Sequence, residues 1–161
     1  MLTLRKPNEK DVPPLTLLAH DHGTKFLDDY HEITLEYCYS ILNDDDTLVI
    51  DDNGFPVGVV WFDDKIKGLH SSIHFLIRPE CWKQFLKQEL HKAVISKSFE
   101  EQDIKKLCAY TMHNQKTAIK LLKKLGFYEH KVWRSHTHQQ GKCMDVTFFE
   151  LKRSSWMKRN A

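Results

Sequence analysis

The chain has 161 residues and a mass of 19.1 kDa, with 41% hydrophobic and 11% aromatic residues, which is enough to bury one core and excludes a disordered tail. Its longest apolar run, residues 57–62, is too short to span a membrane. Charged residues from Arg5 onward interrupt any signal-type apolar block, so we expect neither a membrane span nor a secretory signal.

The net charge of +2 conceals a segregation along the chain. Residues 1–70 carry 14 acidic and 6 basic side chains, a net charge of −8, whereas residues 71–161 carry 8 acidic and 18 basic ones, a net charge of +10. Two interpretations remain open. The charges form ordinary solvated surfaces, or the basic half faces a polyanion such as coenzyme phosphates, nucleic acid or an acidic partner.

The first 70 residues are predicted to form a strand, two helices and a hairpin. Strands are predicted at residues 2–5, 47–50 and 57–62. Periodicity predicts helices at residues 12–20 and 32–42, the second beginning at Glu32. Pro13 and Pro14 fit the first turn of the first helix, and Asn8 and Asp11 are its cap candidates. Asn53-Gly54 between the last two strands predicts a tight hairpin turn.

The rest of the chain is predicted to alternate between strands and helices. The pattern gives strands at 71–78, 106–112, 129–137 and 144–151, the last two joined by a turn at 140–142, and helices after Pro79 and between Asn114 and Gly126. The first of these helices is expected to run unbroken with one buried stripe made by Trp82, Phe85, Leu86, Leu90, Ala93 and Val94.

No repeat or linker interrupts this order, so we expect a single α+β domain over residues 1–151 and a basic tail over residues 152–161. Two interpretations of the tail remain open. It is a frayed end with one residue docked on the core, or Trp156 and the surrounding cations form a docking segment for DNA or an assembly partner.

The cysteines and histidines give no strong signal for a metal or a nucleophile. Cys38, Cys81, Cys108 and Cys143 are too widely spaced for a zinc site or a disulfide scaffold, which predicts reduced and mostly buried thiols in a cytosol-assembled protein. The His-x-His pairs are His20 with His22 and His136 with His138. Positions i and i+2 share a face on a strand, so the second pair could hold two metal ligands, but no third ligand is identifiable and we expect no metal site.

The segment 114–127, Asn-Gln-Lys-Thr-Ala-Ile-Lys-Leu-Leu-Lys-Lys-Leu-Gly-Phe, resembles the GNAT superfamily of N-acetyltransferases, and the order of elements extends the resemblance over nearly the whole chain. It implies an α+β (α/β) fold with a mixed central sheet of about seven strands flanked by about four helices. Asn114 would cap the helix, Ala118 would allow close approach, and Gly126 would turn the chain into the next strand.

The coenzyme region of that family is altered in this sequence. Active members place glycines in a loop that opens a helix, so that backbone N–H groups hold the pyrophosphate of coenzyme A. Where one branch often has Trp-Gly-x-Gly, this chain has Trp82, Lys83, Gln84 and Phe85. Side chains at the two glycine positions would hinder the approach of phosphate oxygens, although Lys83 offers a compensating charge.

The general acid of the family is also missing from its usual place. The Tyr that often protonates the leaving thiolate corresponds to Leu122 here. Tyr110 and Tyr128 are near in sequence, but packing on their strands is enough to explain each of them.

These departures favour a non-catalytic protein as the first hypothesis. In this view the chain is a GNAT-fold scaffold without a cofactor, similar to the head-assembly or internal virion proteins of short-tailed phages that take part in DNA ejection. Its partners would be other virion or assembly proteins, with DNA bound through the basic half. It would occur in the host cytoplasm during assembly and then in the virion.

The alternative hypothesis is an active, cytoplasmic acetyl-CoA-dependent N-acetyltransferase. Its coenzyme region would comprise Trp82, Lys83, Gln84, Phe85 and Asn114. A water molecule or Tyr128 would then replace the usual acid, and the acidic first half would recruit a cationic amine or a protein amino terminus.

Overall fold

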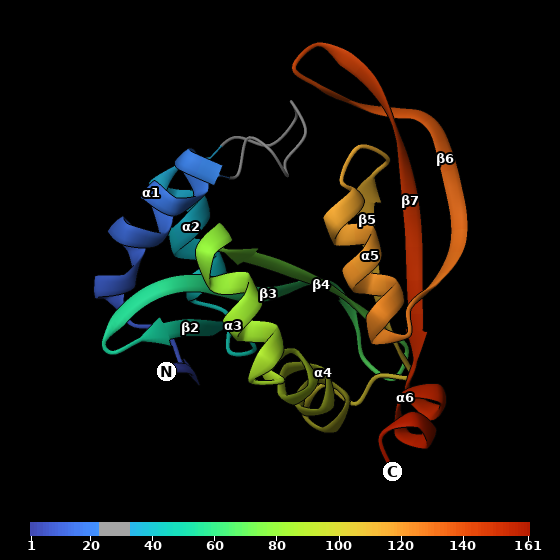
Figure 1. The fold of residues 1–161 in the computed structure, drawn as a ribbon, viewed down its shortest axis with the longest axis horizontal. Helices are drawn as coiled ribbons and strands as arrows, with labels where there is room; N and C mark the ends of the chain where they lie inside the picture. The colour runs from blue at the N-terminus through green and yellow to red at the C-terminus, as the bar shows by residue number, and fades with distance from the viewer. Residues whose placement is uncertain (23–32) are drawn as a thin grey trace. The chain divides into compact units, whose positions relative to one another are not determined.

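The computed structural model describes residues 1–22 and 33–161, and in them we find seven strands in one mixed sheet and six α-helices (Figure 1). The elements in chain order are β1 (Leu2–Arg5), α1 (Val12–His22), α2 (Leu35–Leu42), β2 (Leu48–Asp52), β3 (Phe55–Ile66), β4 (His70–Ile77), α3 (Trp82–Lys87), α4 (Leu90–Glu101), β5 (Lys106–Met112), α5 (Lys116–Leu125), β6 (Tyr128–Gln139), β7 (Lys142–Lys152) and α6 (Arg153–Arg159). Short 3-10 turns, Glu9–Asp11 and Pro79–Cys81, precede α1 and α3.

The strand order is β1-β2-β3-β4-β5-β7-β6, with β4 parallel to β5 and antiparallel pairing of β1 with β2, β2 with β3, β5 with β7 and β6 with β7. The predicted mixed sheet of about seven strands is confirmed. The helix expected from Glu32 begins at Leu35, and Glu32 itself lies outside the described residues. In the described parts of the chain no helix is long and apolar enough to cross a membrane.

The described residues form two compact units. The amino-terminal unit comprises residues 1–22, 33–62 and 74–96, and the carboxyl-terminal unit comprises residues 63–73 and 97–161. In the amino-terminal unit, apolar side chains of α1 and α2 pack with those of β2, β3 and β4 to form a core of Leu15, Leu18, Ala19, Cys38, Leu42, Val49, Val59 and Leu76.

The hairpin between β2 and β3 follows the predicted Asn-Gly signal. Asn53 and Gly54 both have positive φ angles, 53° and 90°, which is the backbone that a tight turn between twisted strands requires. Asp51 holds the turn because its Oδ1 accepts a hydrogen bond from the N–H of Gly54 at 2.6 Å.

A charged cluster joins β1 to the start of α1 and to β2. The guanidinium of Arg5 donates two hydrogen bonds to Asp11, at 2.7 and 2.8 Å, and one from Nε to Asp51 at 2.8 Å. Burial alone would raise the pKa of Asp11, which is 2% exposed, but Arg5 and the N–H of Asn8 hold this pKa below its ordinary value.

Asp11 should therefore make folding depend on pH. A carboxyl group with a lowered pKa in the folded state stabilises the fold at pH values above its unfolded pKa of about 3.9, and this contribution is lost as the pH falls from that value through the lower pKa of the folded state. We expect Asp11→Asn to lower the free energy of unfolding by about 2 kcal/mol at pH 7 and to weaken its decline below about pH 4. Urea denaturation over this range measures both effects. Glu9→Gln, an exposed neighbour, is the control, and an unchanged pH dependence in Asp11→Asn would contradict the prediction.

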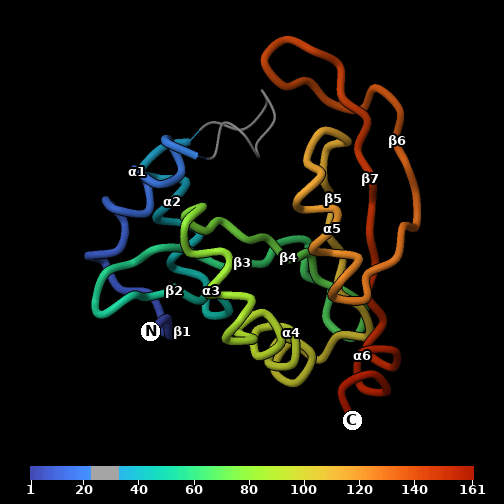
Figure 2. Tube along the Cα trace, viewed as in Figure 1, coloured from blue at the N-terminus to red at the C-terminus, as the bar shows by residue number. Residues whose placement is uncertain are grey.

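The prediction of one unbroken helix after Pro79 is wrong. The chain forms α3 and α4, separated at Gln88 and Glu89, where Glu89 has a φ of 56° (Figure 2). The side-chain amide of Gln88 exchanges two hydrogen bonds with the backbone of Leu2, at 3.1 and 3.0 Å. In α4, Ala93 is exposed and His91 is buried, contrary to the expected stripe, whereas Val94 is buried as expected.

In the carboxyl-terminal unit, β5, β7 and β6 form an antiparallel sheet. Helix α5 ends at Gly126, whose φ of 96° is the predicted left-handed cap. The turn between β6 and β7 consists of Gln140 and Gly141, which lies within the predicted turn at 140–142 (Figure 2).

The last residues of the chain form α6. Trp156 is 3% exposed, so it is the docked residue of this segment. Arg159 Nη2 donates a hydrogen bond of 2.9 Å to the carbonyl oxygen of Lys124 near the end of α5. This hydrogen bond joins α6 to α5. It places the positive charge of Arg159 at the carboxyl terminus of α5, where the helix dipole favours a cation.

Candidate functional site

In the amino-terminal unit, the junction between β4 and α3 carries a partly buried cation. The N–H of Arg78 donates to the carbonyl oxygen of Val57 at 2.9 Å, which ties the junction to β3. The Arg78 guanidinium lies over the ring of Phe55, 5.4 Å from its centroid, and 3.7 Å from the carboxylate of Glu80. Its Nε is buried and has no hydrogen-bond partner among the described residues. The Arg78 side chain as a whole is 35% exposed, so the junction presents a cation at the surface.

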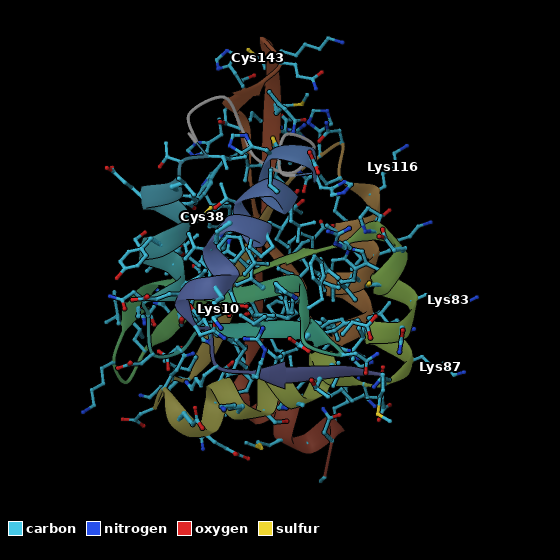
Figure 3. The ribbon with its side chains drawn as sticks, turned by 90° about the vertical axis from the view of Figure 1, so that its left-hand side faces the viewer. Lys10, Cys38, Lys83, Lys87, Lys116 and Cys143 are labelled. Atoms are coloured by element: carbon cyan, nitrogen blue, oxygen red, sulfur yellow. The ribbon has the colours of Figure 1, made fainter. Side chains whose placement is uncertain are left out.

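The four residues of the predicted coenzyme region, Trp82 to Phe85, divide between surface and core. Lys83 and Gln84 are exposed, and Figure 3 shows Lys83 and Lys87 pointing away from α3 on the same side. Phe85 is 0% exposed and packs edge-on against Trp82 and Phe75, with ring centroids 5.9 and 6.1 Å apart. The ring of Phe85 fills the core beneath the helix, so it does not cover the outer side of α3.

Cys81, the residue before α3, is a poor nucleophile. Burial raises the pKa of its thiol, and the charges of Glu80 and Asp52 raise it further. The thiol is thus held in its protonated form, which is unreactive in nucleophilic attack.

A stacked pair, Trp61 on β3 and His74 on β4, was missed by the sequence analysis. Their ring centroids are 5.0 Å apart and their planes differ by 15°. Both side chains are partly exposed, and Trp61 packs against the core that α1 and α2 cover. The available signal was strand alternation, because Trp61 shares its face of β3 with Val59, and His74 shares its face of β4 with Leu76. A histidine on the core-facing side of a strand was the feature to notice.

In the carboxyl-terminal unit, Asn114 does not cap α5 as expected. The cap position is Gln115, without a side-chain cap hydrogen bond, and Asn114 is exposed. The Nδ2 of Asn114 donates instead to Oε1 of Gln139 at 2.8 Å, which links the end of β5 to β6. Asn114 thus lies beside the start of α5 and contacts a strand rather than the helix.

Tyr128 lies on β6, and its hydroxyl is engaged with a buried carboxylate. Its Oη donates a hydrogen bond of 2.8 Å to Glu150, and Glu150 also accepts a hydrogen bond of 2.7 Å from Nζ of Lys106. The hydrogen bond to Glu150 and burial raise the pKa of Tyr128, which is 40% exposed. Leu122, which the resemblance places where the family often has its acid, is 7% exposed and packs in the core.

The two histidine pairs lie apart from any cluster of possible metal ligands in the described residues. Within residues 1–22 and 33–161, no three His, Cys, Asp or Glu side chains come together to bind a metal ion. His136 instead contacts the ring of Trp133, with centroids 4.8 Å apart.

Comparison with solved structures places the fold among N-acetyltransferases. Spermidine N-acetyltransferase from Vibrio cholerae, in complex with CoA and spermine, matches with a TM-score of 0.81 and 18% identity over 97% of this chain and 98% of that chain. Ribosomal-protein-alanine N-acetyltransferase from Brucella melitensis matches with a TM-score of 0.79 and 19% identity over 93% of this chain and 99% of that chain. A search by sequence among curated proteins found no match.

A family model described as acetyltransferase (GNAT) domain matches residues 1–128. Our first hypothesis, a non-catalytic phage assembly protein, is therefore wrong. The domain that matches is an acetyltransferase domain, so the finding points to an acetyltransferase and not to a virion component. The hypothesis rested on the two absent glycines and on Leu122 in place of the Tyr that the family often has. The match over most of its length shows that this chain belongs to the acetyltransferase (GNAT) domain family.

Proposed function

We propose that the protein is an acetyl-CoA-dependent N-acetyltransferase that acts on a cationic amine or a protein amino terminus. The observation that carries this proposal is the match of residues 1–128 to the acetyltransferase domain. Two of the structural relatives are named for acetylating spermidine and a ribosomal protein alanine, which are a cationic amine and a protein residue. The acidic excess of residues 1–70 agrees with a cationic acceptor.

The residues at the start of α3 fit a coenzyme that carries phosphate groups. Arg78 offers a guanidinium on a side chain that is 35% exposed, and Lys83 adds an exposed cation on α3. Phe85 leaves this side of the helix open because its ring is in the core. Acetyl-CoA, when bound, supplies an activated acetyl thioester. Arg78 and Lys83 would hold its phosphates.

We propose that His74 is the base that accepts a proton from the acceptor amine. The attacking nitrogen of a cationic amine must lose a proton, and an imidazole is suited to accept it near neutral pH. His74 lies four residues before Arg78, which is about 13 Å along the strand. It is therefore separate from the cations that we propose bind the phosphates. Trp61, stacked on His74, orients the imidazole and presents an aromatic surface to a cation.

The test of the function is acetyl transfer to a panel of amines. Purified protein is mixed with acetyl-CoA and spermidine, spermine, an aminoglycoside or a peptide with a free amino terminus, and the released thiol is measured together with the mass of the product. We expect transfer to at least one acceptor. Failure of acetyl-CoA to bind in calorimetric titration, together with no transfer to any acceptor, would refute the proposal.

Arg78→Gln should raise the Kd for acetyl-CoA about tenfold or more, because a charge-assisted hydrogen bond to phosphate is lost. Calorimetric titration measures this change. Lys10→Gln removes an exposed cation from the same unit, away from the β4–α3 junction, and is the matched control (Figure 3). Equal affinities of Arg78→Gln and the parent would show that Arg78 does not contact the coenzyme.

A further inference from the structure

The tip of the β6–β7 hairpin brings a thiol and an imidazole together. The two turn residues, Gln140 and Gly141, have φ angles of 51° and 74°, which fix the hairpin and align His138 on β6 with Cys143 on β7. The Sγ of Cys143 lies 3.1 Å from Nε2 of His138. Cys143 is exposed, and Figure 3 shows it at the end of the hairpin. The pair is therefore both preformed and accessible.

This arrangement has the chemistry of an activated thiol. The thiolate is the reactive form of cysteine, and a neighbouring imidazole promotes it by accepting the proton and remaining as a cation beside the sulfur. Lys142, next to Cys143 in sequence, is exposed and adds positive charge. Nucleophilic cysteines are characteristically found in exposed, electropositive surroundings of this kind.

The other three cysteines lack these features. Cys38 and Cys108 are buried, and burial raises the pKa of Cys108 to about 11. Cys81 is half-buried, with a pKa that burial and nearby carboxylates raise. All four thiols are free, so Cys143 is the candidate reactive thiol and the other three cysteines of the same chain serve as references for its reactivity.

We propose that Cys143 is a modification site that forms a mixed disulfide with low-molecular-weight disulfides, with His138 as the base. The proton of Cys143 moves to Nε2 of His138, and the thiolate attacks one sulfur of the disulfide R–S–S–R. A new bond forms between Sγ and that sulfur as the old S–S bond breaks, and the other sulfur leaves as a thiolate that takes up a proton. Sγ is oxidised and the leaving sulfur is reduced, so no further oxidant is needed. The site is independent of the proposed acetyl transfer.

The test is the reaction of the full chain with glutathione disulfide, followed by mass spectrometry of the intact protein and of its peptides. We expect the adduct on Cys143 to form at least about tenfold faster than on Cys81. His138→Gln should slow the reaction at Cys143 about tenfold, and Cys143→Ser should abolish the fast adduct.

His136→Gln is the matched control, because it removes a histidine from the same strand whose ring contacts Trp133. It should react at the rate of the parent, and thermal unfolding should be the same for all variants at this exposed tip. Either of two outcomes would overturn the proposal: Cys143 reacting no faster than Cys81, or His138→Gln reacting as fast as the parent.

Discussion

Replacing Phe85 with alanine should lower the free energy of unfolding by about 3 to 5 kcal/mol, the range for truncation of a buried phenylalanine. The ring is fully buried in the amino-terminal unit, where it contacts the rings of Trp82, Phe75 and His91. Removal of the ring takes away its transfer free energy and leaves a cavity among aromatic side chains, which cannot easily collapse. Phe85→Gly should lose about 1 kcal/mol more, because it also places a glycine inside α3.

Urea denaturation measures these losses. Lys83→Ala, an exposed position on the same helix, is the control and should change the stability by no more than about 0.5 kcal/mol. Neither substitution at Phe85 should improve the affinity for acetyl-CoA, since the ring does not stand on the outer side of the helix. A small loss of stability combined with tighter coenzyme binding would show instead that Phe85 obstructs the site.

The elements that could be predicted from sequence are those with local signals. Asn53-Gly54 fixes a hairpin by backbone chemistry alone, and the apolar stripe and Gly126 define the end of α5 without reference to distant residues. The break between α3 and α4 has a different origin. It coincides with the contact between Gln88 and Leu2, which are 86 residues apart, and no local periodicity contains that contact.

The function required a distinction that the sequence pattern could not make. The spacing of the stripe correctly placed Phe85 in the core, but the same residue was also taken to block a coenzyme loop. A side chain at a glycine position obstructs only if it points toward the ligand, and this one points into the core. The guanidinium of Arg78, which in our proposal holds phosphate, owes its place to the fold of the β4–α3 junction, and the sequence alone does not mark it as a site residue.

The Trp61–His74 pair illustrates the same limit for the candidate site. Each residue alone fits an alternating strand, and their stacking follows only from the side-by-side arrangement of rings on β3 and β4. From the sequence, the family's acid was therefore found to be missing at Leu122, Tyr128 was considered as its replacement, and the base that we propose, His74, was overlooked. The structure instead finds Leu122 in the core and the hydroxyl of Tyr128 bonded to Glu150.

His74→Gln should lower kcat for amine acetylation about 100-fold, because glutamine keeps a polar side chain of similar reach but cannot accept a proton from the ammonium group. The KM for acetyl-CoA should change little, since Arg78 and Lys83, rather than His74, hold the phosphates in our proposal.

Trp61→Phe is the companion variant, because it keeps an aromatic ring beside His74 and leaves the imidazole in place. It should retain most of kcat. Steady-state kinetics, with thermal unfolding of each variant as a check on folding, separates a base from a packing residue. If His74 only packs, its substitution will lower the melting temperature and leave kcat of the folded enzyme unchanged, and the proton must then leave the amine by way of water.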